Sequence, residues 1–171
     1  MLNFNGLRVR KLNQTISTDD IIPGRYKHMY TDPEKLAKHI FENLFPGFSK
    51  TVKHGDVLCS TSTFGIGSSR EQAVSSLLSA GVVMVIAPAF GRIFFRNSWN
   101  LGLIAIETKN LNVHEKERID VDLYNGEIIT DGSIARFSPP PASMLKMVMN
   151  GGLLPMLAER TSKVIIRSEK I

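Results

Sequence analysis

The sequence predicts an α/β protein whose central sheet is mostly parallel. Three strand-like segments, at residues 56–62, 82–88 and 103–107, alternate with two segments of helical periodicity. Strands that alternate with helices are typical of parallel sheets. The segment "VVMVIAP" is continuously apolar and rich in β-branched residues, which indicates a strand covered on both faces. With 171 residues, 43% of them hydrophobic, we expect a single domain over residues 1–171.

The first third of the chain contains one strand and one helix. "LRVRKL" at residues 7–12 alternates apolar and basic residues, which predicts a half-buried strand. "STDDIIPGRY" at residues 17–26 follows, with a turn at Pro23-Gly24. "TDPEKLAKHIFENLF" at residues 31–45 predicts a helix with Asp32 as its N-cap, ended by Pro46-Gly47.

The two middle helices and the last third of the chain also have local signals. One helix should bury Ala73, Val74, Leu77 and Leu78, and "GRIFFRNSWNLG" at residues 91–102 should form another, ended by Gly102. Residues 118–130 predict a hairpin with a type I′ turn at Asn125-Gly126. Residues 141–152 predict a last helix, with Gly151 as its C-cap.

The composition excludes several kinds of protein. Cys59 is the only cysteine, so this chain has no internal disulfide and cannot alone build a cysteine-held metal site or cluster. No run approaches the roughly 20 apolar residues of a membrane span, so we expect a cytoplasmic protein. The net charge of +5 comes from dispersed residues, which argues against a nucleic-acid surface. It suits an anionic small substrate or an acidic partner, and equally an ordinary solvated surface.

The stretch "TFGIGSSREQAV" at residues 63–74 is the most distinctive in the chain. A glycine-spaced turn leads into Ser68, Ser69 and Arg70, and then into a helix. One interpretation is structural, because Ser68 with Glu71, or Ser69 with Gln72, fits a capping box. The other is an anion site, because a helix N-terminus with a guanidinium can bind a carboxylate and stabilise a serine anion. The spacing fits neither a P-loop nor a hydrolase elbow.

A second polar cluster precedes this stretch by about fifty residues. Asp19, Asp20, Arg25, Lys27 and His28 crowd around the Pro23-Gly24 turn. An exposed loop is one explanation. A site shared with Ser68 and Arg70 is the other, because one cluster can bind anions and the other carries an acid.

Four segments together carry a family resemblance: "TDDIIPGRY", "FGIGSSREQAV", "VIAPAFGRIFFRNSWNLGLIAI" and the late "NGG". They resemble the small subunit of 3-isopropylmalate dehydratase, a stand-alone version of the swivel domain of aconitase. The resemblance implies a swivelling β/β/α domain. It also implies a large-subunit partner that carries a [4Fe-4S] cluster on three cysteines, which agrees with the single cysteine here.

The resemblance also implies a reaction and roles for several residues. A hydroxy di- or tricarboxylate would be dehydrated and rehydrated, as in leucine biosynthesis. Ser68 matches the serine that removes the proton next to a carboxylate, and Ser69 and Arg70 match groups that bind that carboxylate. Asp19 matches an aspartate that organises the site. Arg25 matches an arginine of the isopropylmalate branch, where tethering of the loop explains it equally well.

The segment "RYKHMY" departs from the family pattern, which leaves the substrate open. Lys27 stands where related sequences tend to have leucine, and with His28 it could favour a third carboxylate, as in homoaconitase. Met29 and Tyr30 could instead line a pocket for an isopropyl or methyl group, and Lys27 could simply be solvated. A 2,3-dimethylmalate dehydratase and a non-catalytic binding module are further alternatives. We expect this polar segment to be mobile in the isolated chain.

Overall fold

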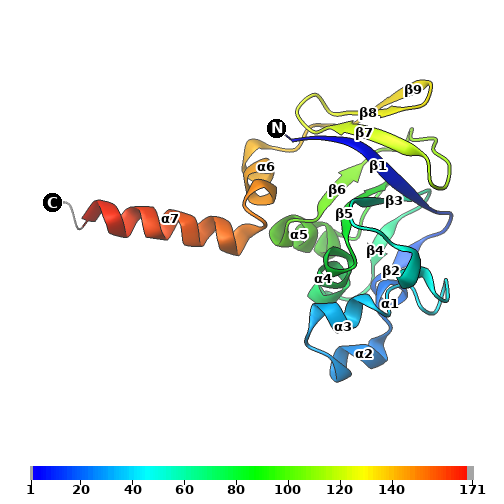
Figure 1. Ribbon diagram of the computed structural model, residues 1–171, viewed down its shortest axis with the longest axis horizontal. Coiled ribbons are helices and arrows are strands. Elements are labelled where there is room, and N and C mark those ends of the chain that lie inside the picture. Colours follow the sequence, from blue (N-terminus) through cyan, green and yellow to red (C-terminus); the bar gives the residue numbers. More distant parts are fainter. Residues whose placement is uncertain (1, 169–171) are drawn as a thin grey trace.

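A seven-stranded mixed sheet organises the molecule (Figure 1). The computed structural model describes residues 2–168, with the backbone alone for Lys27, Arg160 and 162–168. The strand order is β6-β5-β3-β1-β7-β8-β9. The parallel half consists of β1 (Asn3–Leu12), β3 (Asp56–Ser60), β5 (Val82–Ala87) and β6 (Ile104–Glu107). The antiparallel half adds β7 (Arg118–Asp122), β8 (Glu127–Thr130) and β9 (Ser133–Arg136) to the other side of β1. The α/β class, the parallel core and the hairpin are therefore confirmed.

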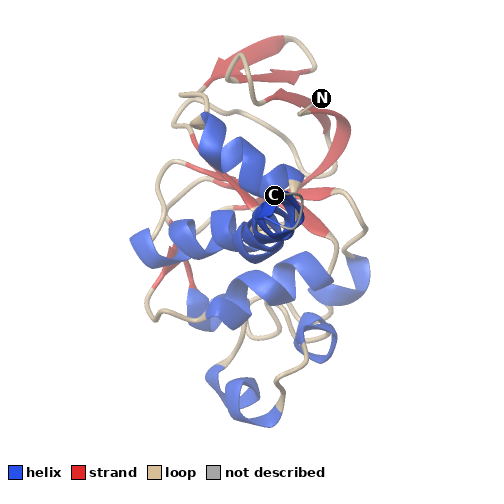
Figure 2. Cartoon of the chain, turned by 90° about the vertical axis from the view of Figure 1, so that its left-hand side faces the viewer, coloured by secondary structure: helices blue, strands red, loops and turns tan. Residues whose placement is uncertain are grey.

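The central strands of the parallel half, β3 and β5, are covered on both faces. Every residue of β3 is buried, which is the pattern expected of a strand between two layers. Two apolar clusters lie in the molecule, one containing Trp99 and Met84 and the other containing Phe64 and Leu77. Helices α4 (Glu71–Ser79) and α5 (Arg92–Leu101) pack against each other and contribute to these clusters. Figure 2 shows helices in front of the strands when the molecule is viewed from the C-terminal side.

The region between β1 and β3 differs from its prediction. The expected turn at residues 17–26 contains two short helices, α1 (Thr18–Ile21) and α2 (Gly24–Met29). The expected helix over 31–45 is only α3 (Pro33–Ala37), followed by turns and the 3-10 helix η1 (Phe48–Thr51). Asp32 caps α3 as predicted. The helical path stops because buried Phe41 takes a left-handed φ of 55° and donates its N–H to the carbonyl of Ile21.

The last third of the chain also corrects two predictions. The β7–β8 connection has four residues, 123–126, and of these only Gly126 has a positive φ, so the turn is not type I′. The carboxylate of Asp122 holds it by accepting from the N–H groups of Tyr124 and Asn125. Helix α6 (Ala142–Met149) ends with Asn150 as C-cap, and Gly151 follows at φ 75°. Helix α7 (Leu153–Ser168), which no sequence signal predicted, projects from the body (Figure 1).

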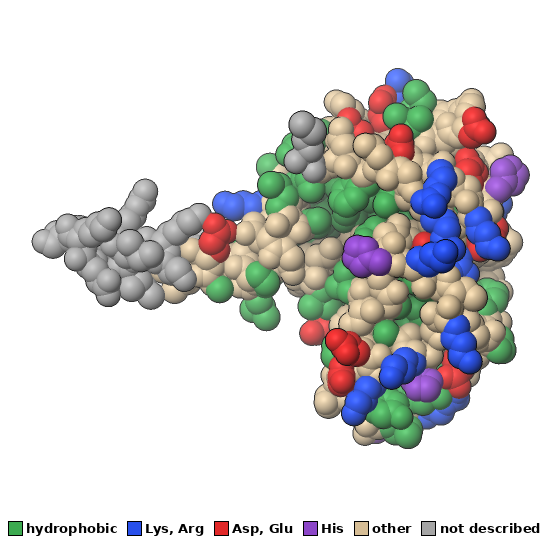
Figure 3. Space-filling view, viewed as in Figure 1, with side chains coloured by type: hydrophobic (Ala, Val, Ile, Leu, Met, Phe, Trp, Pro, Cys, Tyr) green, Lys and Arg blue, Asp and Glu red, His purple; other side chains and the backbone are tan. Residues whose placement is uncertain are grey.

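A hollow lies between α5 and α6. Its volume is about 440 Å³, and its lining is largely apolar, including Phe90, Phe95, Trp99 and Met144. Figure 3 shows hydrophobic side chains gathered on the upper part of the body, to the right of the projecting C-terminal helix. Within the described part of the chain, no helix has the length and apolar character that crossing a bilayer requires.

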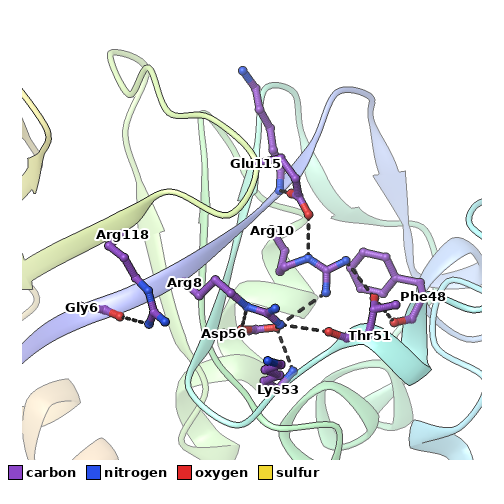
Figure 4. A network of polar contacts seen from close by, with 10 residues as sticks. Gly6, Arg8, Arg10, Phe48, Thr51, Lys53, Asp56, Glu115 and Arg118 are labelled. Carbon is purple, nitrogen blue, oxygen red and sulfur yellow. Dashed lines mark hydrogen bonds and ion pairs between the residues drawn. The ribbon is translucent and has the colours of Figure 1, made fainter.

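A buried network of charges ties β1 to β3 and η1 (Figure 4). The carboxylate of Asp56 accepts hydrogen bonds from Arg8 Nε at 2.8 Å, Arg8 Nη2 at 2.6 Å and the N–H of Lys53 at 2.9 Å. Arg10 Nη1 lies 3.7 Å from the same carboxylate, and Arg10 Nε donates to Glu115. Burial by itself would raise the pKa of Asp56, but the hydrogen bonds and the two guanidinium charges outweigh it and lower that pKa.

Candidate functional site

Two short parallel strands bring the two polar clusters together. Strand β2 (Ile16–Ser17) pairs with β4 (Phe64–Ile66), with Ser17 opposite Ile66. The residues that follow these strands, Thr18 and Gly67, are therefore neighbours although they are about fifty positions apart. A Cβ on Gly67, whose φ is 105°, would lie 3.2 Å from Thr18 Oγ1. The fold thus brings the two polar clusters side by side, which is the arrangement that a shared site would require.

The turn before Ser68 depends on two glycines in close contact. Gly65 has a φ of 74°, and a Cβ there would lie 2.3 Å from Phe94 Cγ. A Cβ on Gly91 would lie 2.2 Å from the carbonyl oxygen of Gly65. A backbone hydrogen bond joins the two segments here, because the N–H of Gly91 donates to the carbonyl of Phe64 at 2.9 Å. Only glycine allows the two segments to approach so closely, and this approach places the Ser68 turn beside the start of α5.

The capping interpretation of the two serines is not what the structure shows. Arg70 is the N-cap residue of α4, and among the described residues no side chain donates or accepts a capping hydrogen bond there. The capping box of this region lies instead at α1, where the Ser17 hydroxyl accepts from the N–H of Asp20 at 3.1 Å. Ser68 and Ser69 are both exposed, so their hydroxyls can face a ligand.

Thr18 holds Ser68 in place. The N–H of Ser68 donates to Thr18 Oγ1 at 3.1 Å, and the two side-chain oxygens are 3.5 Å apart. Thr18 is 1% exposed, so this contact comes from the buried side and leaves the outer side of Ser68 open. We call Ser68, Ser69, Arg70 and the start of α4 the polar mouth. The N–H groups at the start of α4 and the helix dipole add partial positive charge there.

Arg70 and Asp19 form an ion pair beside the serines. Arg70 Nη1 donates to Asp19 Oδ1 and, at 3.3 Å, to the carbonyl of Ile22. Arg70 Nε is buried and finds no partner among the described residues. Because both bonds use Nη1, Nη2 stays available to a bound carboxylate. Gly24, the first residue of α2, lies against the pair, since a Cβ there would be 3.5 Å from Arg70 Nη2 and from Asp19 Oδ1.

The other candidate residues lie on α2. Arg25 points to Glu42, with Nη2 donating to Oε1 at 2.9 Å and to Asn43 at 3.3 Å. His28 and Met29 are exposed. The side chain of Lys27 lies outside the described residues, so its predicted contact with substrate stays a prediction. Asp20 belongs to the α1 capping box. Thr18, His39 and Glu42 are also neighbours of these residues. No local pattern in the sequence marks them, because their contacts are made across the fold.

The residues of this chain do not fit an iron–sulfur cluster. Cys59 lies in β3, 3% exposed, and burial raises the pKa of its thiol to about 12. Such a thiol stays protonated, whereas metal ligation needs the thiolate. Among the described residues, no group of three His, Cys, Asp or Glu side chains could hold a metal ion. The candidate site offers hydroxyls, amides and a guanidinium on an open surface.

The chain is similar in sequence and in fold to a class of protein, the aconitase swivel domains. Residues 1–111 match the family described as Aconitase C-terminal domain. The chain is 39% identical over 158 residues to 3-isopropylmalate dehydratase small subunit 1 of Thermotoga maritima, covering 91% of this chain and 95% of the relative. It is 40% identical over 160 residues to the isopropylmalate/citramalate isomerase small subunit of Methanocaldococcus jannaschii, with the same shares covered.

A solved structure agrees with these relatives. The crystal structure of 3-isopropylmalate dehydratase from Methanocaldococcus jannaschii has a TM-score of 0.87 and 35% sequence identity. The match covers 99% of this chain and 100% of that one. The chain therefore belongs to the 3-isopropylmalate dehydratase small-subunit family, within the aconitase C-terminal domain family.

Proposed function

We propose that this chain is the small subunit of a two-chain hydro-lyase that interconverts 2- and 3-isopropylmalate in leucine biosynthesis, in the cytoplasm. Relatives with this name at about 40% identity over most of the chain support the proposal. The observation that carries it is the exposed Ser68 hydroxyl at a mouth formed by the start of α4 and the Arg70–Asp19 pair. A large subunit, implied by the family name, would cover this open surface.

Ser68 would act as the base. Its hydroxyl has a high intrinsic pKa, so removing its proton requires strong stabilisation of the anion. The amides at the start of α4 and the nearby guanidinium of Arg70 provide positive potential, and Thr18 Oγ1, at 3.5 Å, is placed to donate to the anion. The serine would take the proton from the carbon next to a substrate carboxylate.

Ser69 and Arg70 would bind that carboxylate. Binding it with cationic and hydroxyl donors stabilises the negative charge that develops when the neighbouring carbon loses its proton. Asp19 would keep the guanidinium in position through the ion pair. Lys27 and His28 on α2 would contact the rest of the substrate, whereas Arg25 pairs with Glu42. The [4Fe-4S] cluster, held by the large subunit, would supply a Lewis acid for the substrate hydroxyl.

A replacement of Ser68 tests the proposal. The chain is mixed with a cluster-loaded large subunit under anaerobic conditions. The mixture should convert isopropylmalate, and the ultraviolet absorbance of the enoate intermediate measures the conversion. Ser68→Ala should lower kcat by about 10²–10⁴, the usual contribution of a positioned acid or base. Ser79→Ala, at the exposed far end of α4, should leave kcat unchanged. An intact wild-type pair that turns over no hydroxy acid would favour a non-catalytic binding module.

The range of substrates is a second question with a specific observation behind it. One relative is named for both isopropylmalate and citramalate. These acids differ in whether an isopropyl or a methyl group must be accommodated. Measuring kcat/KM for both, together with a tricarboxylate such as homocitrate, would identify the preferred side group of this protein.

A further inference from the structure

Helix α2 depends on contacts outside itself. It spans only six residues, Gly24–Met29, and isolated helices shorter than about 12 residues are marginal in water. No apolar periodicity supports it, and among the described residues no side-chain hydrogen bond caps its start. The structure nevertheless contains this helix where the sequence indicated a mobile loop. Its stability must therefore come from the residues packed against it.

The carboxylate of Glu42 forms hydrogen bonds with three side chains, two of them from α2. Tyr26 Oη donates to it, 3.0 Å from each oxygen, and Arg25 Nη2 donates to Oε1 at 2.9 Å. His39 Nδ1 lies 2.6 Å from Oε2, and because a carboxylate only accepts, Nδ1 must carry a proton. The hydrogen bond from His39, followed by those from Tyr26 and Arg25, lowers the pKa of Glu42, although removal from solvent opposes this.

Aromatic rings add a second set of contacts between the same segments. The Tyr26 ring stacks on His39 with centroids 3.9 Å apart and planes 18° apart. Tyr30, just after α2, stacks on the same imidazole at 5.9 Å and 5°. The guanidinium of Arg25 lies 4.8 Å from the centre of the Tyr26 ring. We call Arg25, Tyr26, His39 and Glu42 the Glu42 clamp. Stacking and charge-assisted hydrogen bonds together restrict both the position and the rotation of α2.

The start of α2, next to the clamp residues Arg25 and Tyr26, touches the candidate site. Gly24 lies against the Arg70–Asp19 pair, and the carbonyl of Ile22, two residues earlier, accepts from Arg70 Nη1 at 3.3 Å. The first residue of α2 lies against the ion pair, the next two belong to the clamp, and Tyr30, just after the last residue, stacks on His39. Contacts at both ends give the helix a defined direction. A change in the clamp therefore changes where His28 and Met29 stand relative to Ser68.

We propose that Glu42 is a positioning residue that orients α2 and thereby sets which side group of the hydroxy acid the site accepts. The proposal rests on the proposed function, and specifically on substrate contact by α2. It gives Arg25 a place in the clamp rather than on the substrate. Ser68 and Arg70 lie outside the clamp, so loss of the clamp should change discrimination more than the rate of the chemical step.

The test compares substrates with the reconstituted two-chain enzyme. Glu42→Gln removes the charge at constant shape, and Tyr26→Phe removes the hydroxyl but keeps the ring. Each should change the ratio of kcat/KM for isopropylmalate over citramalate by about tenfold, mainly through KM. Tyr26 and Glu42 belong to the same clamp, so either substitution already disrupts it. The double variant should therefore change the ratio no more than the stronger single variant. Glu34→Gln, an exposed residue of α3 outside the clamp, is the matched control and should leave the ratio unchanged.

Amide hydrogen exchange of the free small subunit gives a readout independent of catalysis. The N–H of Tyr30 donates to the carbonyl of Tyr26 at 3.0 Å and closes the end of α2. Its exchange should be about tenfold faster in Glu42→Gln and in Tyr26→Phe, but not in Glu34→Gln, because local opening exposes this group. Unchanged exchange would overturn the clamp itself. An active pair with an unchanged substrate ratio would overturn its role in discrimination, whereas a wild-type pair inactive on both acids would refute the proposed function instead.

Discussion

Replacing Asp56 by asparagine should destabilise the protein strongly, because this carboxylate balances the positive charges of two guanidinium groups in the interior. Asp56 is 1% exposed and accepts three hydrogen bonds, two from Arg8 and one from the N–H of Lys53. Arg10, 7% exposed, has its Nη1 3.7 Å away without any hydrogen bond to another described residue. Asparagine keeps one acceptor oxygen, places an N–H₂ group beside the arginines and removes the negative charge.

The magnitude follows from what remains after the change. Removing one partner of a buried ion pair costs about 3–5 kcal/mol. Arg10 keeps Glu115 at 2.9 Å, and Arg8 is partly solvated, so we expect the lower end, about 3 kcal/mol. For a chain of this size that corresponds to a fall in Tm of about 6–12 °C. Urea unfolding followed by the fluorescence of Trp99, the only tryptophan and 2% exposed, measures the loss.

The pH dependence gives a second test with a defined sign. The pKa of Asp56 is lowered in the folded state from its ordinary value of 3.8. A depressed carboxyl pKa contributes stability that is present above the unfolded value and lost as the pH falls through the folded value. The stability difference between wild type and Asp56→Asn should therefore be full at neutral pH and shrink below about pH 4.

A surface pair provides the control for this prediction. Arg136 and Glu127 form an ion pair at 3.3 Å in which the Arg136 side chain is 80% exposed. Glu127→Gln should cost less than about 1 kcal/mol. A loss below about 1 kcal/mol in Asp56→Asn, or a difference from wild type that does not change with pH, would refute the argument that buried charge compensation stabilises the join between β1 and β3.

Two further predictions concern the turn before Ser68 and the single thiol. Gly65→Ala should cost about 3 kcal/mol or more, because the new Cβ meets the Phe94 ring at 2.3 Å at a φ of 74°. Gly132→Ala, at a φ of 98° with no described atom within 4 Å, should cost only about 1 kcal/mol in the same urea titration. Cys59, with its pKa raised to about 12 by burial, should resist a thiol reagent at neutral pH until the chain unfolds. Rapid stoichiometric labelling without denaturant would contradict this.

The elements that the sequence predicted well carry their signals locally. The apolar run of β5 forms a buried strand because its apolar side chains point to both faces and are stabilised by burial on each of them. Helix α5 ends at Gly102 because that residue, at a φ of 90°, adopts the left-handed conformation that glycine favours. The N-cap at Asp32 is confirmed for the same reason, since its hydrogen bond reaches only to Glu34.

The predictions that failed depend on distant residues. The helix expected over 31–45 stops early because Phe41 packs in the interior and bonds to Ile21, twenty positions before it. Helix α2 forms because His39 and Glu42 hold Tyr26 and Arg25. Neither contact leaves a period or a capping pattern in the sequence that a local analysis could detect.

The α/β class, the glycine-spaced turn with its two serines and the family resemblance can all be predicted from the amino-acid sequence. These follow from local periodicity, from backbone conformations that glycine allows and from a distinctive order of residues. The contacts of Thr18 and Asp19 with Ser68 and Arg70, and those of α2 with Glu42, are visible only in the folded chain. Contacts between residues far apart in the chain depend on how the strands pair and pack, and that arrangement is a property of the whole fold.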